Sequence, residues 1–435
     1  MNPLSPILLS LLDEISAALA YGETPPDTLF AQLESLWRAE RPNDLPSLAA
    51  LLASLRARPD EARLAAAFAR FFELSPQPGA DVGAVQPEAA GEDLFTVTRG
   101  EQEESEREGW MYPVFFGTNR APSDPVQSDN PFSGRRGSAI TYGRCDVWIP
   151  ATHRFGETGT PWWRRWARLQ FADDHLRLEY TDVLGDADFW RALQEEVARA
   201  ENGAPQGLVF LHGYNVGFQD AAIRAAQMGF DLKVSGATAF FSWPSQGTLA
   251  AYPADAAAIE ASEDAITRFL ADFARHSGAE VVHLVAHSMG NRGLLRALQR
   301  LAADGELCAG VKFGQIFLAA PDVDRDLFLG LARLYPQFSD RTTLYASDGD
   351  KAVAMSAWLH AGPRAGYFPP VTVAAGVDRL DTVTVPDFDF DLLGHSYFAQ
   401  AEALLHDMFD LIRHGTPPAQ RQRLLPNGGH WVMRR

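Results

Sequence analysis

Apolar residues follow two different periods along the chain. From Ser5 to Leu74 they recur at helical spacing, as at Ile7, Leu8, Leu11 and Leu12. After residue 207, short apolar runs of strand length alternate with longer helical patterns. Such alternation is typical of a mostly parallel sheet with helices on both faces. The predicted strands of that sheet are residues 208–211, 237–241, 281–285, 315–318, 342–345 and 379–385.

The two patterns are separated by a stretch without periodicity. Residues 76–109 are rich in Pro, Gly, Ala and charged residues, which predicts a linker. From Trp110 a β-rich segment begins, with candidate strands at 114–116 and 146–150, and we expect residues 117–120 to form the turn between them. We therefore predict a small all-helical domain at 1–75, which we expect to cover the site as a cap, a linker at 76–109 and an α/β domain at 110–435.

Composition excludes several classes of protein. The formal net charge of -18 disfavours nucleic acid as a partner. Only Cys145 and Cys308 occur, so neither a disulfide framework nor a cysteine-based metal site is expected. The N-terminus has no Lys or Arg before Arg38, and no uncharged apolar run approaches the roughly 18 to 20 residues needed to span a bilayer. We therefore expect a soluble cytoplasmic protein without a membrane segment.

One strand-to-helix junction has the pattern of a nucleophile elbow. The β-branched run at 281–285 enters the stretch Ala286-His287-Ser288-Met289-Gly290, and an apolar helical pattern follows. A sharp turn between strand and helix lifts a serine hydroxyl above the sheet, provided that its neighbours are small. Ala286 stands where Gly is usual and is also small. Ser288 could merely be a helix N-cap, but this context favours a nucleophile.

The second predicted part of the site is an oxyanion hole. The apolar run at 208–211 leads into His212-Gly213-Tyr214-Asn215, where a third strand would turn and aim a backbone N–H at the reacting oxygen. We predict the backbone amides of Tyr214 and Met289 as the donors. Asn215 orders this loop or is itself a donor.

A serine nucleophile needs a base, and in this type of site the acid and the histidine follow the serine along the chain. Of the histidines after Ser288, His395 lies in a short loop between a predicted strand and a final helix, where a catalytic histidine belongs. His406 and His414 fall in a helical pattern, and His430 lies in the terminal tail. We therefore predict His395, rather than these residues or His360, as the base.

The acid that orients the histidine should follow the strand at 342–345. Asp350 and Asp348 compete for this role, and we prefer Asp350, because Asp348-Gly349 resembles turn chemistry. Asp322 and Asp324 are reserves, although helix capping explains at least one of them. The pair His212 and His287 has no third ligand at metal spacing, so we predict no metal and no cofactor.

Together, these segments resemble an uncharacterised bacterial branch of the α/β-hydrolases, the family of unknown function 900, from about residue 114 to 398. The resemblance implies an α/β-hydrolase fold with Ser288, His395 and Asp350 in the triad positions, but it specifies no substrate. The stretches that carry it are Val114-Phe115-Phe116-Gly117-Thr118-Asn119-Arg120, Phe210-Leu211-His212-Gly213-Tyr214-Asn215, Phe241-Ser242-Trp243-Pro244-Ser245, Ala286-His287-Ser288-Met289-Gly290-Asn291-Arg292, Leu318-Ala319-Ala320-Pro321-Asp322-Val323-Asp324 and Gly394-His395-Ser396.

The function predicted from the sequence is hydrolysis of a small or medium carboxylic ester through an acyl-enzyme on Ser288. A thioesterase or an amidase would use the same residues. A third alternative is a binding or scaffold protein in which the N-terminal helices block the site or recruit a partner.

Overall fold

The computed structural model describes residues 109–124, 131–151, 153, 176–200, 203–246, 251–360, 362–386 and 398–434, together with Ser35. Apart from Ser35, the predicted helical domain lies outside these residues, and so does the predicted linker apart from Gly109. So does the loop that carries His395.

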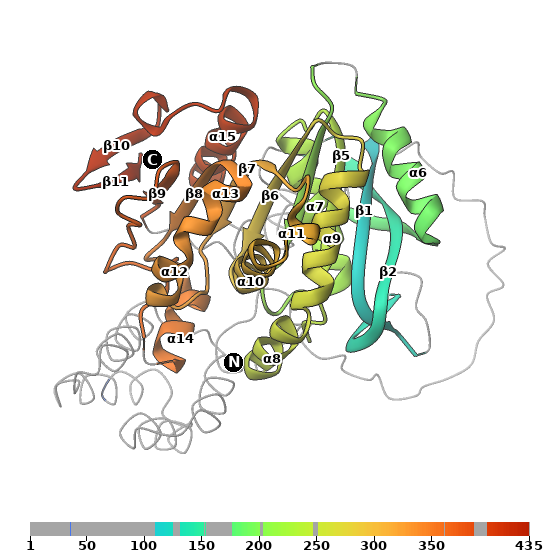
Figure 1. Cartoon of the computed structure of the whole chain (residues 1–435), viewed down its shortest axis with the longest axis horizontal. Helices are drawn as coiled ribbons and strands as arrows, with labels where there is room; N and C mark the ends of the chain where they lie inside the picture. The colour runs from blue at the N-terminus through green and yellow to red at the C-terminus, as the bar shows by residue number, and fades with distance from the viewer. Residues whose placement is uncertain are drawn as a thin grey trace, which may run out of the picture.

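The described chain is built on one sheet of eleven strands in the order β10-β11-β9-β8-β7-β6-β4-β5-β1-β2-β3 (Figure 1). The pairs β1–β2, β2–β3 and β10–β11 are antiparallel, and the other neighbours run parallel. The strands are β1 (Gly109–Pro122), β2 (Phe132–Pro150), β3 (Arg177–Leu184), β4 (Gln206–Leu211), β5 (Gly236–Ser242), β6 (Val281–His287), β7 (Phe313–Ala319), β8 (Ser339–Ala346), β9 (Leu380–Thr384), β10 (Leu424–Asn427) and β11 (His430–Met433).

The central strands confirm the predicted parallel sheet. Every residue of β7 is buried, and β4, β5 and β6 expose at most their first or last residues. Strands covered on both faces read as mostly apolar runs, which is why these four predicted strands could be located in the sequence.

The prediction for residues 117–120 is wrong, because they continue β1 and form no turn. Residues 114–118 pair in parallel with β5, while β1 also pairs with β2 along its other edge. Thr118, Asn119 and Arg120 are buried polar residues, and their hydrogen bonds to Ser242 and Ser262 join positions more than a hundred residues apart. Local sequence suggests a turn, and these distant hydrogen bonds hold the segment extended instead.

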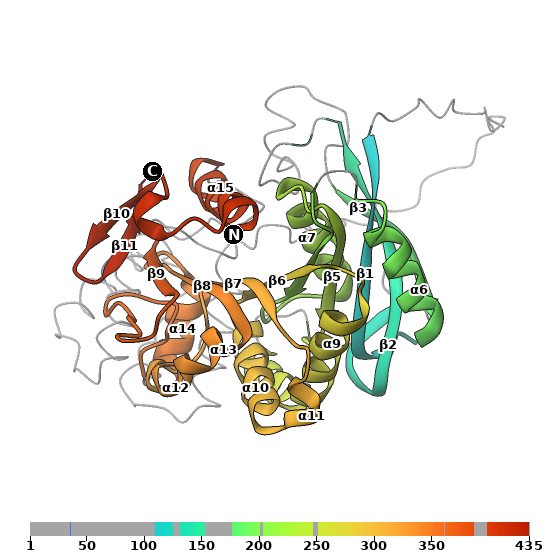
Figure 2. The ribbon, with the colours of Figure 1, turned by 45° about the horizontal axis from the view of Figure 1, so that its top comes forward.

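Helices cover both faces of the sheet, as predicted (Figure 2). One face packs on α6, α8, α9, α10 and α12, and the other packs on α7 and α15, with a separate apolar core under each group. The helices are α6 (Asp186–Val197), α7 (Phe218–Asp231), α8 (Tyr252–Ala261), α9 (Glu263–His276), α10 (Gly290–Ala303), α11 (Gly305–Cys308), α12 (Arg325–Leu331), α13 (Tyr335–Phe338), α14 (Lys351–Leu359) and α15 (Phe398–His414), with short 3-10 turns η2 (Ala332–Leu334) and η4 (Pro418–Gln420).

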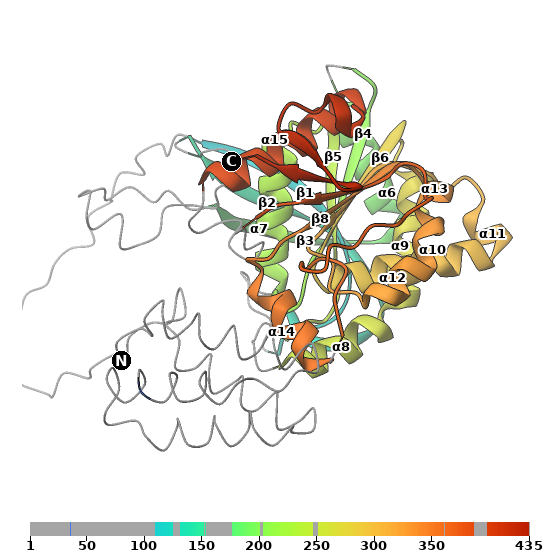
Figure 3. The ribbon, with the colours of Figure 1, turned by 90° about the vertical axis from the view of Figure 1, so that its left-hand side faces the viewer.

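The strand order reverses beside β4. From β4 the chain moves to β5 on one side and then returns to β6 on the other side. Sites of open α/β sheets lie outside the carboxyl ends of strands at such a switch point. Helices α8 and α14, which follow β5 and β8, lie side by side at one end of the sheet (Figure 3), with Tyr252 Oη and Ser356 Oγ 2.7 Å apart.

Within the part of the chain that the structure describes, no helix combines the length and the apolar character needed to cross a bilayer.

Candidate active site

Ser288 lies at the sharp turn between β6 and α10, as the sequence predicts. Its φ is 46°, in the left-handed region that residues other than glycine rarely adopt, and its side chain is buried. The Ser288 N–H donates to the Ala319 carbonyl of β7 at 2.9 Å, and the Ser288 carbonyl accepts from the Asp322 N–H at 3.1 Å. Strained backbone of this kind persists only where its surroundings hold it, and it is concentrated at functional sites.

Two glycines allow the turn after β4 to touch the elbow. A Cβ on Gly213 would lie 3.1 Å from Ser288 Cβ and 2.9 Å from His287 Nδ1. A Cβ on Gly290 would lie 2.5 Å from the His212 carbonyl oxygen. Since ordinary contacts are longer than these, neither position has room for a side chain. The structure therefore brings the predicted oxyanion turn directly against the predicted nucleophile.

The predicted oxyanion donors lie on the two segments that meet here. Met289 is the N-cap of α10, where backbone N–H groups have no acceptor within the helix. Tyr214 is buried, and its ring packs edge-on against Tyr252 with the ring centroids 5.3 Å apart. Asn215, the next residue, has a φ of 56° and donates its N–H to Asp255 Oδ2 at 3.1 Å. The assignment of the donor role to the Tyr214 and Met289 amides stays a prediction.

Asn291 is a residue of the elbow for which the sequence pattern predicts no role. Its side chain is fully buried, and Nδ2 donates to the carbonyls of Ala286 at 3.0 Å and Ser288 at 3.1 Å. These bonds tie the two sides of the turn together. An asparagine on the buried face of an otherwise apolar helix pattern is the signal that could have found it, since a buried amide needs partners.

The two competing acids follow β8. Asp350 is completely buried and accepts the Val353 N–H through Oδ1 at 2.8 Å, at the start of α14. Asp348 is half-buried in the same turn. The preference for Asp350 stays a prediction, and so does the role of His395, which lies outside the described residues.

Asp322, one of the reserve acids, is at the centre of a buried network. Its carboxylate pairs with Arg292 Nη2 at 2.9 Å and with Arg364 Nε at 3.5 Å. It also accepts hydrogen bonds from the hydroxyls of Tyr252, at 2.5 Å, and of Ser356. Burial acts to raise the pKa of Asp322, but the two guanidinium groups and the two hydroxyls outweigh it and hold the pKa at about 2. This carboxylate is already committed to four partners.

Asp324, the other reserve acid, caps a helix. Its Oδ1 accepts the N–H groups of Asp326 and Leu327, each at 3.0 Å, at the start of α12. This confirms the capping interpretation for this residue.

The histidines on either side of the site are neutral. Burial, with a smaller effect of Arg120, lowers the pKa of His212 to about 3, and burial together with Arg224 does the same for His287. The ring of His212 stacks on Trp243 with centroids 4.9 Å apart. Within the described ranges, no cluster of three or more His, Cys, Asp or Glu side chains is arranged to hold a metal ion.

The other histidines that follow Ser288 have separate positions. His360 is exposed after α14, His406 and His414 are exposed on α15, and His430 lies in β11. The positions of His406 and His414 on a helix agree with the helical pattern of the sequence.

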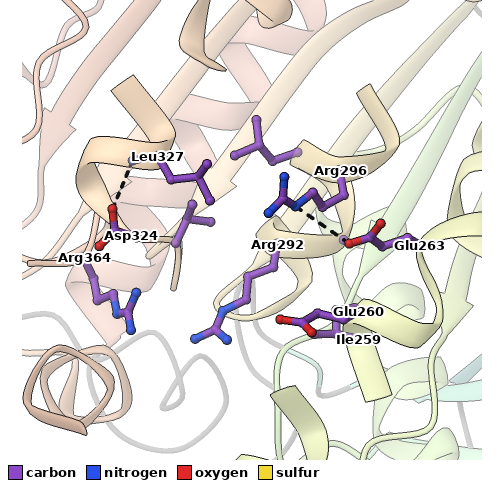
Figure 4. A pocket seen from close by; sticks show the side chains of 11 residues that line it. Ile259, Glu260, Glu263, Arg292, Arg296, Asp324, Leu327 and Arg364 are labelled. Carbon is purple, nitrogen blue, oxygen red and sulfur yellow. Dashed lines mark hydrogen bonds and ion pairs between the residues drawn. The ribbon is translucent and has the colours of Figure 1, made fainter. Parts of the chain in front are cut away.

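A hollow of about 130 Å³ lies beside the site, between α8–α9, α10 and α12. Arg292 and Arg364 reach into it from opposite sides, and Arg296 pairs with Glu263 at its edge at 3.7 Å (Figure 4). Its lining does not include Ser288, so this hollow is separate from the elbow.

Comparison with known proteins supports the fold. The model of one family, described as an alpha/beta hydrolase of unknown function (DUF900), matches residues 191–414, which is more than half of the chain. These residues contain Ser288, Tyr214, Asp350 and His395. A comparison with curated protein sequences gives no match.

Solved structures show only distant likeness. An uncharacterised protein from Bacillus cereus ATCC 10987 is 13% identical, with 51% of this chain and 67% of that chain covered and a TM-score of 0.32. An esterase from the fungus Rhizomucor miehei is 11% identical, with 72% and 86% covered and a TM-score of 0.31. Brefeldin A esterase, described as a bacterial homologue of human hormone-sensitive lipase, is 12% identical, with 80% and 74% covered and a TM-score of 0.29. Likeness at this level adds nothing to the family match.

Proposed function

The chain belongs to the α/β-hydrolase family of unknown function 900, and from this premise we propose that it is a serine esterase that cleaves small or medium carboxylic esters. The triad of this proposal is Ser288, His395 and Asp350. The oxyanion donors are the backbone amides of Tyr214 and Met289.

The contact between two turns is the observation that carries the proposal. Ser288 adopts a φ of 46° at the end of β6, and Gly213 at the end of β4 has its Cβ position 3.1 Å from Ser288 Cβ. An N-cap serine needs neither the strained backbone nor a glycine turn against it. A nucleophile needs both, because its hydroxyl must meet the substrate carbonyl while backbone N–H groups reach the carbonyl oxygen.

Acylation of the serine is the first half of the reaction. His395 takes the proton of Ser288 Oγ, and the oxygen attacks the ester carbonyl carbon. Negative charge develops on the former carbonyl oxygen, which the two amides stabilise. His395 then gives the proton to the departing alkoxide, so that an alcohol leaves and the acyl group stays on Ser288. Asp350 holds the imidazole in the required tautomer and stabilises its charged form.

Deacylation repeats these steps with water. His395 takes a proton from the water molecule, the hydroxide oxygen attacks the acyl carbon, and the proton returns to Ser288 Oγ as the carboxylic acid forms. An ester is the proposed substrate because an alkoxide leaves with less assistance than an amine.

Hydrolysis of short-chain p-nitrophenyl esters by the full chain and by Ser288→Ala tests the proposal. We expect kcat to fall by about 10³-fold or more in the variant, because the attacking atom is gone. Labelling with a fluorophosphonate followed by peptide mapping tests the identity of the nucleophile separately. The adduct is expected on Ser288. Equal, near-background rates for both proteins, or an adduct on another serine, would overturn the proposal.

The triad acid is tested by a pair of variants two residues apart. Asp350→Asn should lower kcat by about 10³- to 10⁴-fold, because an asparagine side chain favours the wrong imidazole tautomer. Asp348→Asn is the matched control and should change kcat by much less. The reverse ranking would move the acid to Asp348 and leave the rest of the mechanism in place.

A further inference from the structure

Arg120 is a buried arginine whose partners surround the turn beside Ser288. Its side chain reaches four polar atoms from the end of β1. Nη2 donates to the Val216 carbonyl at 2.8 Å, Nη1 to the Ser245 carbonyl at 2.8 Å, and Nε to Ser242 Oγ at 2.8 Å. A weaker bond joins Nη1 to the Ser133 carbonyl at 3.3 Å. The two short bonds to main-chain oxygens therefore reach the segment after β4, at Val216, and the segment after β5, at Ser245.

Asp255 supplies the complementary acceptors from α8. It is fully buried, and its Oδ2 accepts the Asn215 N–H at 3.1 Å and Ser245 Oγ at 2.6 Å. Its Oδ1 accepts the Gln246 N–H at 2.8 Å. Ser245 Oγ in turn accepts the Val216 N–H at 3.1 Å. Arg120 therefore binds carbonyl groups of these segments, and Asp255 with Ser245 binds their N–H groups.

A chain of hydrogen bonds also leads from Arg120 to the glycine that touches the nucleophile. His212 Nδ1 lies 2.8 Å from the Gly213 carbonyl, so Nδ1 must carry the ring proton. Nε2 is then an acceptor, and it lies 3.4 Å from Ser242 Oγ. Ser242 Oγ accepts from Arg120 and can donate its own proton to His212. Arg120, Ser242 and His212 thus form a relay that ends on Gly213.

We infer that Arg120 is a positioning residue for catalysis, which together with Asp255 fixes residues 212–217, here called the oxyanion loop, so that the Tyr214 N–H faces the reacting carbonyl oxygen. This inference rests on the proposed function. It also assigns a role to the two stretches, 114–120 and 241–245, that the triad leaves unexplained.

An arginine suits this role better than any other residue. Its planar fork offers five donors in fixed directions, whereas a lysine offers one flexible ammonium group. Burial lowers the pKa of Arg120 to about 9, with Asp255 acting in the opposite direction, so the side chain keeps its charge at neutral pH. A buried charge that holds several carbonyl oxygens costs desolvation, and it keeps those oxygens in one geometry.

Kinetics of three variants of the full chain test the inference. Arg120→Lys, Asp255→Asn and Ser245→Ala each remove part of the clamp and leave Ser288 intact. We expect kcat for p-nitrophenyl acetate to fall by about 100-fold in Arg120→Lys and less in Ser245→Ala, with KM changed by less than about twofold, because a displaced donor weakens the transition state more than substrate binding. The rate of fluorophosphonate labelling should fall in parallel.

Asp231→Asn is the matched control. Asp231 is as buried as Arg120 and pairs with His153 at 2.7 Å, but it ends α7 ahead of β5, at the opposite end of the sheet from Ser288. It should lower the melting temperature without changing kcat at 25 °C. Variants that lose stability to the same extent as this control, but keep wild-type kcat and labelling rate, would show that Arg120 is structural only and overturn the inference.

The outcomes separate the two proposals. A wild-type chain that neither hydrolyses esters nor labels at Ser288 overturns both. An active wild type with an unaffected Arg120→Lys variant overturns the positioning role alone. If Arg120→Lys does not fold, Ser245→Ala decides, because it removes one hydroxyl and no charge, and an unchanged kcat in that variant counts against the clamp.

Discussion

Two buried polar clusters flank the elbow, and they are built differently. The cluster around Arg120 and Asp255 binds mainly backbone N–H and C=O groups of the oxyanion loop and of residues 242–246. The cluster around Asp322 binds mainly side chains, those of Arg292, Tyr252 and Ser356, which come from three different helices. The first arrangement fixes where backbone atoms point, and the second holds helices together.

This difference indicates what each cluster contributes. Orientation of backbone donors should appear in the rate of the chemical step, because transition-state charge forms beside them. Ties between α8, α10 and α14 should appear in stability. We therefore expect loss of the Asp255 carboxylate to lower mainly kcat. Loss of the Asp322 carboxylate should lower mainly the free energy of unfolding.

The largest expected effect is that of Asp322→Asn on stability. The change leaves Arg292 and Arg364 without their buried counter-charge, and breaking a buried pair in this way costs about 3 to 5 kcal/mol. Urea unfolding measures it. Below the unfolding temperature, kcat should stay within about threefold of wild type, since the Asp322 backbone N–H that binds the Ser288 carbonyl is kept.

Asp255→Asn is the comparison variant, with kcat as its main effect. A variant Asp322→Asn that stays stable but loses activity would break the comparison. It would also identify Asp322, rather than Asp350, as the acid that orients the histidine.

The pH dependence of stability is a smaller effect, and it distinguishes the two clusters because they respond at different pH values. His212 belongs to the Arg120 cluster, and its pKa is lowered from 6.5 to about 3. Between these values the unfolded chain binds the proton and the folded chain does not, so stability falls as the pH decreases from about 6.5 towards 3. Each pH unit costs about 1.4 kcal/mol, or about 2 kcal/mol between pH 6.5 and 5.

The Asp322 cluster should respond only at lower pH. Its carboxyl has a pKa lowered from 3.8 to about 2, so its stabilisation is complete above about pH 4 and is lost as the pH falls through 2. Free energies of unfolding can be measured from pH 7 to 3. In His212→Asn, their slope against pH should decrease above pH 4 by the contribution of one proton, about 1.4 kcal/mol per pH unit. In Asp322→Asn the slope above pH 4 should match wild type, and a change there would contradict this division.

The sequence predicts the part of the site that is local. The turns that carry Ser288 and Gly213 are predictable because an apolar strand, a turn of small residues and a helix follow one another within about ten positions, and the backbone conformation of such a turn depends on its own residues. The central parallel strands are equally local, since burial on both faces makes each a mostly apolar run.

The clamp could not be predicted in this way. Arg120 stands in a Gly-Thr-Asn-Arg stretch that suggests a turn, and only its partners at Val216, Ser242 and Ser245 explain why a charged residue is buried in a strand. The same holds for Asp255 on α8, which no motif marks. A local pattern cannot show that two such residues meet at one loop. The helices before residue 75 and the loop of His395 stay predictions.

The long separations within the clamp have a consequence for how the protein is made. Arg120 is 96 positions from Val216 and 122 positions from Ser242. Contacts so distant in sequence close late, because the chain must first lose the entropy of the intervening segments. We therefore expect the oxyanion loop to reach its geometry only after β1 has joined β5. Under the proposed mechanism, a nascent or partly folded chain would carry Ser288 without an ordered oxyanion loop, so that ester hydrolysis would report completed folding.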